Sequence, residues 1–167
     1  MSRPALVCIV GPPASGKSLL IVSLTEAFRQ RGRRVASAVV RDASTTVATL
    51  PNGGRVTVAR AFAAGELPSF MRALDPNVDL LLAEGFSGLG LPTVEISEGG
   101  GGMPATPRQD LLAVVSSARL IGDFAVFGPG ETGGLAELIE ARVLDTRKRE
   151  PPPASRRRGF IDRLRRR

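Results

Sequence analysis

Residues 11–18 constrain this chain more than any other segment. They follow an apolar run at 5–10 and precede a segment with Leu20, Leu24 and Phe28 on one helical face. Strand, glycine loop and helix in this order is the context of a P-loop, where backbone N–H groups surround phosphate oxygens. We therefore predict a nucleotide site formed by Gly11, Pro12, Pro13, Ala14, Ser15, Gly16, Lys17 and Ser18.

The last two residues of this loop have separate expected roles. Lys17 is predicted to reach the β- and γ-phosphates, and the Ser18 hydroxyl to bind Mg²⁺. Only two of the 23 basic residues are lysines, and Lys17 is one of them. A compact, rotatable ammonium suits phosphate, so its use here supports the prediction. The alternative is a glycine-rich turn without a ligand.

Composition narrows the possible chemistry. A chain of 167 residues and 17.6 kDa is expected to form one compact domain. It has no histidine, so histidine catalysis and histidine metal ligation are excluded. The single cysteine, Cys8, lies in the first apolar run and is expected to be buried. With no disulfide framework, we expect a reducing, cytoplasmic setting.

The positive net charge belongs to the C-terminal residues. Residues 147–167 hold ten basic and two acidic side chains, and residues 1–146 hold thirteen basic and fourteen acidic ones. We predict a nucleotide-binding domain at 1–146 and a basic, disordered tail at 147–167. The domain lacks the basic excess that nucleic-acid binding requires. The tail, as an alternative, can form a short basic helix that contacts acidic lipid or another acidic surface.

Hydrophobic patterning predicts an α/β fold. Apolar strands alternate with helices, which is typical of a doubly wound, mostly parallel sheet with flanking helices. The predicted strands cover residues 5–10, 34–41, two strands within 43–58 around the turn at 51–54, 79–83 ending in Glu84, 93–97, 111–115 and 124–127. The predicted helices cover residues 17–31, a broken segment at 60–74, and 132–144.

Two acidic residues close predicted strands. Ligands of open α/β sheets bind beyond the carboxyl ends of the strands. Glu84 closes its strand and should face the phosphates, whereas Asp79 opens the same strand and should lie at the far edge. Asp42 closes the second strand by the same rule. We predict Lys17, Glu84 and Asp42 as catalytic residues, and Ser18, Glu84 and Asp42 as Mg²⁺ ligands.

Further candidates are less specific. Arg41 can reach an anionic substrate, and Arg108 can close over one. The glycines at 99–102 let a ligand approach the backbone, or they form a mobile loop. Ser116 and Ser117 follow a strand at the place where many GTPases carry a guanine-binding aspartate. The sequence therefore leaves open whether the nucleotide is GTP or ATP.

Two signatures together resemble a known family. The loop at 11–18 and the run Asp-Leu-Leu-Leu-Ala-Glu-Gly-Phe at 79–86 are similar to the molybdopterin-guanine dinucleotide biosynthesis adapter proteins, MobB. The order of segments agrees over about residues 4–146. The resemblance implies a P-loop NTPase fold, GTP with Mg²⁺ and weak GTPase activity. It also implies a homodimer and a partner, the guanylyltransferase that joins GMP to molybdopterin.

One segment departs from that family. After the second strand MobB proteins have a Lys-His-rich stretch, but this chain reads Val-Arg-Asp-Ala-Ser-Thr at 40–45 and has no histidine. Any anion or cofactor contact that the family makes there is altered or lost. A divergent MobB-like protein is therefore expected.

Three functional hypotheses follow. The first is a GTP-binding adapter with weak GTPase activity that assists guanylation of molybdopterin. The second is a P-loop small-molecule kinase, in which Asp42 accepts the proton of the acceptor hydroxyl and Arg108 closes over the ATP phosphates. The third is a nucleic-acid-dependent NTPase, which rests on the basic tail alone. The sequence favours the adapter.

Overall fold

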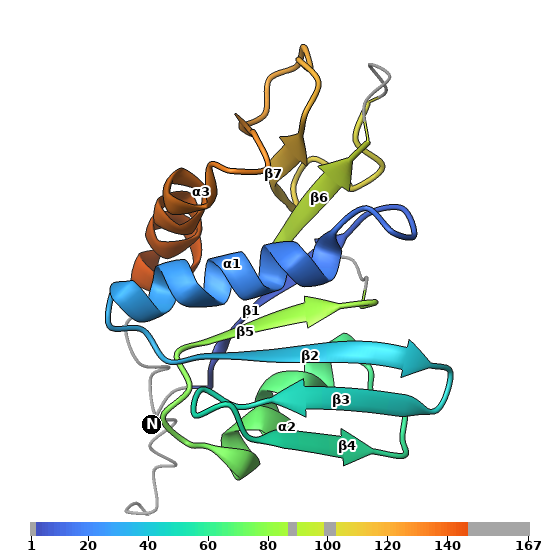
Figure 1. Ribbon diagram of the computed structural model, residues 1–167, viewed down its shortest axis with the longest axis vertical. Coiled ribbons are helices and arrows are strands. Elements are labelled where there is room, and N and C mark those ends of the chain that lie inside the picture. The colour runs from blue at the N-terminus through green and yellow to red at the C-terminus, as the bar shows by residue number, and fades with distance from the viewer. Residues whose placement is uncertain (1–2, 87–89, 99–102, 147–167) are drawn as a thin grey trace, which may run out of the picture.

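An eight-stranded sheet organises the molecule (Figure 1). The computed structural model describes residues 3–86, 90–98 and 103–146, so the predicted tail lies outside the described residues. The strand order is β4-β3-β2-β5-β1-β6-β7-β8. All neighbours pair in parallel except β2–β3 and β3–β4, which are antiparallel. Within the described residues, no helix is long and apolar enough to cross a membrane.

The strand bounds agree closely with those predicted from the sequence. The strands are β1 (Ala5–Val10), β2 (Val35–Asp42), β3 (Thr45–Thr49), β4 (Arg55–Val58), β5 (Leu80–Glu84), β6 (Thr93–Ser97), β7 (Leu111–Ser116) and β8 (Val126–Phe127). The central strand β1 is almost completely buried, because helices or loops cover both faces of the sheet around it. Its cysteine, Cys8, is buried as predicted, and burial raises the pKa of that thiol to about 11.

Helices cover the two faces unequally. Helices α1 (Lys17–Gln30) and α3 (Thr132–Ile139) pack side by side on one face, in front of the sheet in Figure 1. Their apolar side chains meet alternate residues of the strands, including Val7 and Ile9 of β1. The short helix α2 (Leu67–Leu74), preceded by the 3₁₀ turn η1 (Ala64–Glu66), packs against the other face. The sheet is doubly wound, as predicted.

Helix α1 ends where the sequence predicts. The buried residues Leu20, Leu24 and Phe28 recur at the spacing of one helical face. Gly32 then takes a left-handed conformation with φ 72°. The N–H of Gly32 donates to the carbonyl of Arg29, and the N–H of Arg33 donates to that of Phe28. This is the Schellman pattern, and glycine is favoured because it adopts positive φ without steric cost.

Glu95 binds the connection between β6 and β7 to the sheet. Both oxygens of the Glu95 carboxylate, on β6, accept backbone N–H groups of this connection, from Ala105 at 2.9 Å and Thr106 at 2.8 Å. The contact holds residues 105–106 against the sheet before the chain enters β7. Further along, Asp110 is buried, and its carboxylate accepts the N–H of Gly90 at 3.0 Å.

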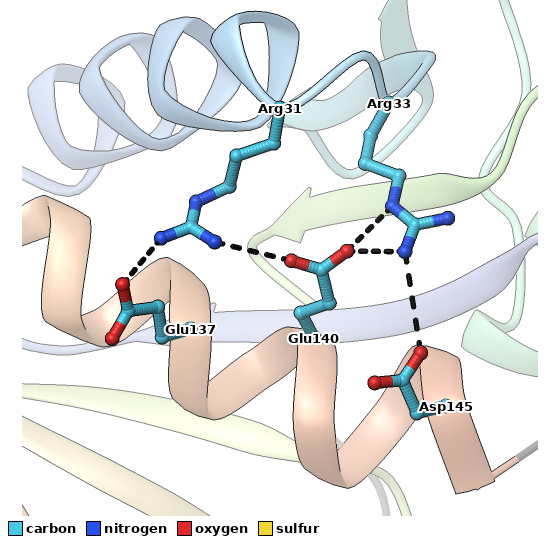
Figure 2. A network of polar contacts seen from close by, with 5 residues as sticks. All are labelled: Arg31, Arg33, Glu137, Glu140 and Asp145. Atoms are coloured by element: carbon cyan, nitrogen blue, oxygen red, sulfur yellow. Dashed lines mark hydrogen bonds and ion pairs between the residues drawn. The ribbon is translucent and has the colours of Figure 1, made fainter.

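The last helix departs from the prediction. The sequence predicts one helix over 132–144, but α3 ends at Ile139 and continues as the π-helical segment η2 (Glu140–Leu144). At this junction Glu140 lies between two arginines that follow α1, as Figure 2 shows. Its carboxylate accepts hydrogen bonds from Arg31 at 3.3 Å and from Nε of Arg33 at 2.7 Å. Arg31 also pairs with Glu137 at 2.7 Å.

Candidate nucleotide-binding site

The P-loop lies at the carboxyl end of β1. Figure 1 shows it as the blue loop that joins β1 to α1. Gly16 caps α1 with φ 84°, and Ala14 also has a positive φ of 60°. A left-handed conformation costs a non-glycine residue about 1–2 kcal/mol, and such strain is concentrated at functional sites. The loop therefore holds a tight, unfavourable backbone turn directly before the N–H groups of the first helical turn, which lack helical acceptors.

Gly11 shows how closely this loop approaches the sheet. A Cβ atom on Gly11 would lie 2.9 Å from Oγ of Ser15 and 3.0 Å from the backbone oxygen of Ile96. Real Cβ atoms are rarely this close to backbone oxygens, so a side chain here would force the loop to move. The glycine that begins the motif is required by packing as well as by backbone conformation.

Lys17 folds back over the loop. Its ammonium donates to the carbonyl oxygen of Pro12 at 2.6 Å and to that of Gly11 at 3.2 Å. These are contacts with neutral acceptors in a partly exposed setting. The lysine of the motif therefore lies at the loop, where the sequence places it.

Ser18 and Glu84 lie in direct contact. The Ser18 hydroxyl donates to Oε2 of Glu84 at 2.8 Å, although the residues are 66 positions apart. The sheet brings them together: β5 pairs in parallel with β1, and Glu84 stands opposite Ile9 near the end of β1. Asp79 precedes the same strand at the opposite edge, where its carboxylate accepts the N–H of Arg34 at 2.9 Å. The predicted separation of these two acids is confirmed.

The chemistry of this pair fits magnesium. Mg²⁺ prefers oxygen ligands and commonly uses one or two carboxylates, with substrate phosphates and water completing its octahedron. Ser18 and Glu84 supply a hydroxyl and a carboxylate beside the phosphate loop. In the described part of the chain, no group of three or more Asp, Glu, Cys or His side chains could hold a metal alone. Water or the phosphate oxygens of a nucleotide would complete the coordination of a Mg²⁺ held by this pair.

Ser15 has an unusual environment. Its hydroxyl oxygen is buried, and among the described residues it is the one buried side-chain oxygen or nitrogen without a hydrogen-bond partner. Leaving a buried polar group unpaired costs about 1–3 kcal/mol. An orphaned hydroxyl inside a phosphate loop fits a site that a ligand or an ordered water completes.

Asp42 is not brought into this cluster by any observed contact. Its carboxylate accepts the N–H of Ser44 at 2.9 Å and the Ser44 hydroxyl at 3.0 Å, which closes the turn between β2 and β3. These bonds lower the pKa of the Asp42 carboxyl. Glu84 stands opposite Val39, so Asp42 lies three residues, about 10 Å, further along the neighbouring strand. A catalytic or metal role for Asp42 stays a prediction.

The arginine candidates differ in their positions. Arg41 is exposed near the end of β2, and its role stays a prediction. Arg108 lies three residues before β7, at the edge opposite the P-loop, and pairs with Asp123 at 2.5 Å. The expectation that Arg108 closes over the nucleotide is therefore wrong, because parallel strands begin at the edge away from the phosphates. The glycines at 99–102 lie outside the described residues.

A cavity of about 350 Å³ opens beside the loop. Ser15 and Gly16 of the P-loop line one side of it, and its other walls come from α1 and from the carboxyl ends of β6 and β7. Several of its lining residues were not selected from the sequence, among them Leu19, Ile96 and Glu98. Two signals were available. Leu19 is an apolar residue outside the buried helical face, and it is 71% exposed. Glu98 directly follows a parallel strand, which is the rule that selected Glu84.

The fold has counterparts among solved structures. A molybdopterin-guanine biosynthesis protein B (MobB) has a TM-score of 0.55 and 27% identity, covering 81% of this chain and 97% of that one. A MobB homolog from Bacillus stearothermophilus has a TM-score of 0.62 and 20% identity, covering 86% and 99%. MobB of Bacillus subtilis has a TM-score of 0.62 and 18% identity, covering 83% and 98%.

The fold of this chain is similar to that of MobB proteins and is a P-loop α/β fold. No protein-family model matches the chain, and no curated protein matches its sequence. The similarity to MobB thus rests on the arrangement of the sheet and helices. The low sequence identity is as expected for a divergent protein. The resemblance stated from the sequence and the predicted α/β fold class are confirmed.

Proposed function

We propose that this chain binds GTP with Mg²⁺ at its P-loop, hydrolyses it slowly, and acts as an adapter in the guanylation of molybdopterin. One observation carries the nucleotide site. The hydroxyl that follows the P-loop lysine meets a carboxylate from the neighbouring strand, Ser18 with Glu84 at 2.8 Å. A phosphate cradle and a hard-cation pair at one strand end together support a Mg²⁺–triphosphate ligand.

Four residues of the site have separate parts in the proposed binding. Lys17 leaves the carbonyls of Gly11 and Pro12 and pairs with phosphate oxygens, exchanging neutral acceptors for charged ones. Ser18 and Glu84 hold the metal, and the metal neutralises charge on the phosphates. The Ser15 hydroxyl gains a partner from the bound ligand or from a water that accompanies it.

Slow hydrolysis follows from what the site lacks. In the described part of the chain, no hydrogen bond brings an arginine or a glutamine to Lys17, Ser18 or Glu84. Efficient NTPases use such groups to orient water and to stabilise the transition state. A partner protein that supplies one would accelerate turnover.

The guanine nucleotide and the pathway are proposed from the relatives. A structural neighbour with 27% identity is named a molybdopterin-guanine biosynthesis protein. The partner proposed here is the guanylyltransferase that transfers GMP to molybdopterin. The kinase alternative is less well supported, because Arg108, its proposed lid residue, is paired with Asp123 at the far edge of the sheet.

The site is tested by separating turnover from affinity. Glu84→Gln removes a metal ligand but keeps the shape of the side chain. We expect Mg²⁺-dependent GTP hydrolysis to fall at least about tenfold, while the affinity for GTP in EDTA stays within about twofold. Glu26→Gln, an exposed charge on α1, is the matched control. An equal loss of affinity and turnover in Glu84→Gln would contradict the metal role.

The adapter role has its own test. Purified guanylyltransferase is assayed for GMP transfer to molybdopterin, with and without this chain at equal concentrations of GTP. We expect the rate to rise with the wild-type chain and to stay at the basal level with Lys17→Ala. If both proteins act alike, the nucleotide site is not needed for this role, and if neither acts, the adapter proposal is wrong.

A further inference from the structure

The cavity beside the P-loop has one charged residue among the described residues that line it, Glu98. The cavity, of about 350 Å³, is within the range of about 300–1,000 Å³ that is typical of small-molecule sites. It begins at Ser15 and Gly16, so a ligand whose phosphates occupy the loop extends into it. We propose that the Glu98 carboxylate binds the ribose hydroxyls of that nucleotide, so that the protein selects ribonucleotides over nucleotides whose sugar lacks these hydroxyls. This inference rests on the proposed nucleotide site.

Strand order determines which part of the nucleotide reaches Glu98. The P-loop follows β1, β6 is the next strand, and β7 is the one after it. Neighbouring strands lie about 4.8 Å apart. Glu98 directly follows β6, one strand from the loop, whereas Ser116 and Ser117 end β7, two strands away. In a nucleotide the ribose is attached directly to the α-phosphate and the base lies beyond it. The ribose therefore falls near Glu98, and the base near the serines.

The chemistry of Glu98 selects hydrogen-bond donors. An ionised carboxylate only accepts hydrogen bonds, and it repels phosphate oxygens. A ribose presents two adjacent hydroxyl donors, and acidic residues bind them in dinucleotide-binding folds. The magnesium pair lies on the other side of β1, since Glu84 is on β5, so Glu98 is placed away from the metal. No hydrogen bond or ion pair to another described residue engages Glu98, unlike Glu95, which is bound to the backbone.

An apolar surface completes the sugar site. The side chain of Leu19, on the first turn of α1, is 71% exposed and lines the same cavity. Ile96 and Val115, both nearly buried, form its floor. A nucleoside in the cavity would cover Leu19 and so remove apolar surface from water.

At the far end of the cavity, the Ser116 hydroxyl already accepts the N–H of Ala118. Glu98, the charged residue of this cavity, thus lies near the sugar and not near the base.

The test compares sugars at a constant base. The full chain is titrated by calorimetry with Mg²⁺-GTP and with Mg²⁺-2′,3′-dideoxy-GTP. We expect the wild-type chain to bind the dideoxy nucleotide at least about tenfold more weakly, as for loss of a charge-assisted hydrogen bond. Glu98→Ala should weaken GTP binding by a similar factor and leave dideoxy-GTP binding unchanged. Glu137→Ala, a remote and exposed carboxylate, should change neither affinity.

The outcomes separate this inference from the proposed function. If the wild-type chain binds GTP and dideoxy-GTP equally, the sugar is not read and the inference is wrong. If Glu98→Ala weakens the binding of both nucleotides equally, the carboxylate acts on the base or by long-range electrostatics. The inference is then again wrong. In both cases Lys17-dependent GTP binding, and with it the proposed function, would stand. If the wild-type chain binds no nucleotide, both fail.

Discussion

The acidic residues at the strand ends differ in what the sequence could predict of them. The sequence predicted that Lys17, Ser18 and Glu84 gather at one strand end, because the motif and the rule for parallel sheets place them there. It could not predict how the Asp42 carboxylate is used. Asp42 binds Ser44 two residues away, and such local bonds compete with any distant partner.

At Gly11 the prediction concerns space. Gly11→Ala places a methyl group 2.9 Å from Oγ of Ser15 and 3.0 Å from the backbone oxygen of Ile96. We expect the loop to shift and the affinity for Mg²⁺-GTP to fall at least tenfold, which corresponds to about 1.4 kcal/mol. Gly133→Ala is the matched control, because nothing lies within 4 Å of its Cβ position. Unchanged GTP affinity in Gly11→Ala would show that nucleotide binding does not need the close packing of Gly11 against Ser15 and Ile96.

Among the elements, the strands were better predicted than the connections. Buried strands such as β1 and β5 are apolar runs, so their limits were visible in the sequence. The contact that holds the connection from β6 to β7 was not visible there. It is made by the Glu95 carboxylate of β6, and a contact of this kind has no local sequence pattern. The same holds for the π-helical end of the last helix, where Glu140 meets Arg33 across 107 positions.

The β6–β7 connection gives a prediction about stability. Glu95→Ala removes the acceptor for the N–H groups of Ala105 and Thr106. We expect the free energy of unfolding to fall by about 1–3 kcal/mol, because two charge-assisted hydrogen bonds are lost. Urea denaturation measures the change. Asp123→Ala, at a side chain that is 99% exposed, is the control for removal of a charge. A loss in Glu95→Ala no larger than in this control would mean that the bonds to the connection contribute little.

Across the whole molecule, the sheet and the two helices on one face act as a single frame. The alternation of strands and helices was enough to predict a doubly wound sheet. The strand order was not predicted, because sequence pattern does not say which strands are neighbours; the strand pairing in the structure supplies it. The arginines that follow α1 join this helix to the last one through Glu137 and Glu140 (Figure 2). The P-loop helix is therefore anchored at its far end.

This anchor predicts a dependence of stability on pH. Hydrogen bonds from Arg33, with the nearby charge of Arg31, hold the pKa of Glu140 below its usual value of about 4.3. A lowered pKa in the folded state stabilises the protein above the unfolded pKa, and the gain disappears as pH falls through the folded value. We expect Glu140→Gln to cost about 1–2 kcal/mol at pH 7, and the difference from wild type to shrink below about pH 4.

The measurement is urea unfolding of the wild type and Glu140→Gln from pH 7 to pH 3. Glu137→Gln serves as the control, because its carboxylate is 69% exposed and binds only one of the two arginines in the network. A difference between wild type and Glu140→Gln that stays constant down to pH 3 would contradict the assigned cause.

Binding of a nucleoside triphosphate by the loop at 11–18 is measured by calorimetric titration of Mg²⁺-GTP into the wild-type chain and Lys17→Ala. We expect saturable one-to-one binding by the wild type. We expect an affinity at least about a hundredfold lower for Lys17→Ala, since a charged phosphate contact is lost in a partly buried site. Matching urea denaturation curves would establish that the variant is folded. Equal affinities of the two folded proteins for Mg²⁺-GTP would mean that this loop does not bind the triphosphate.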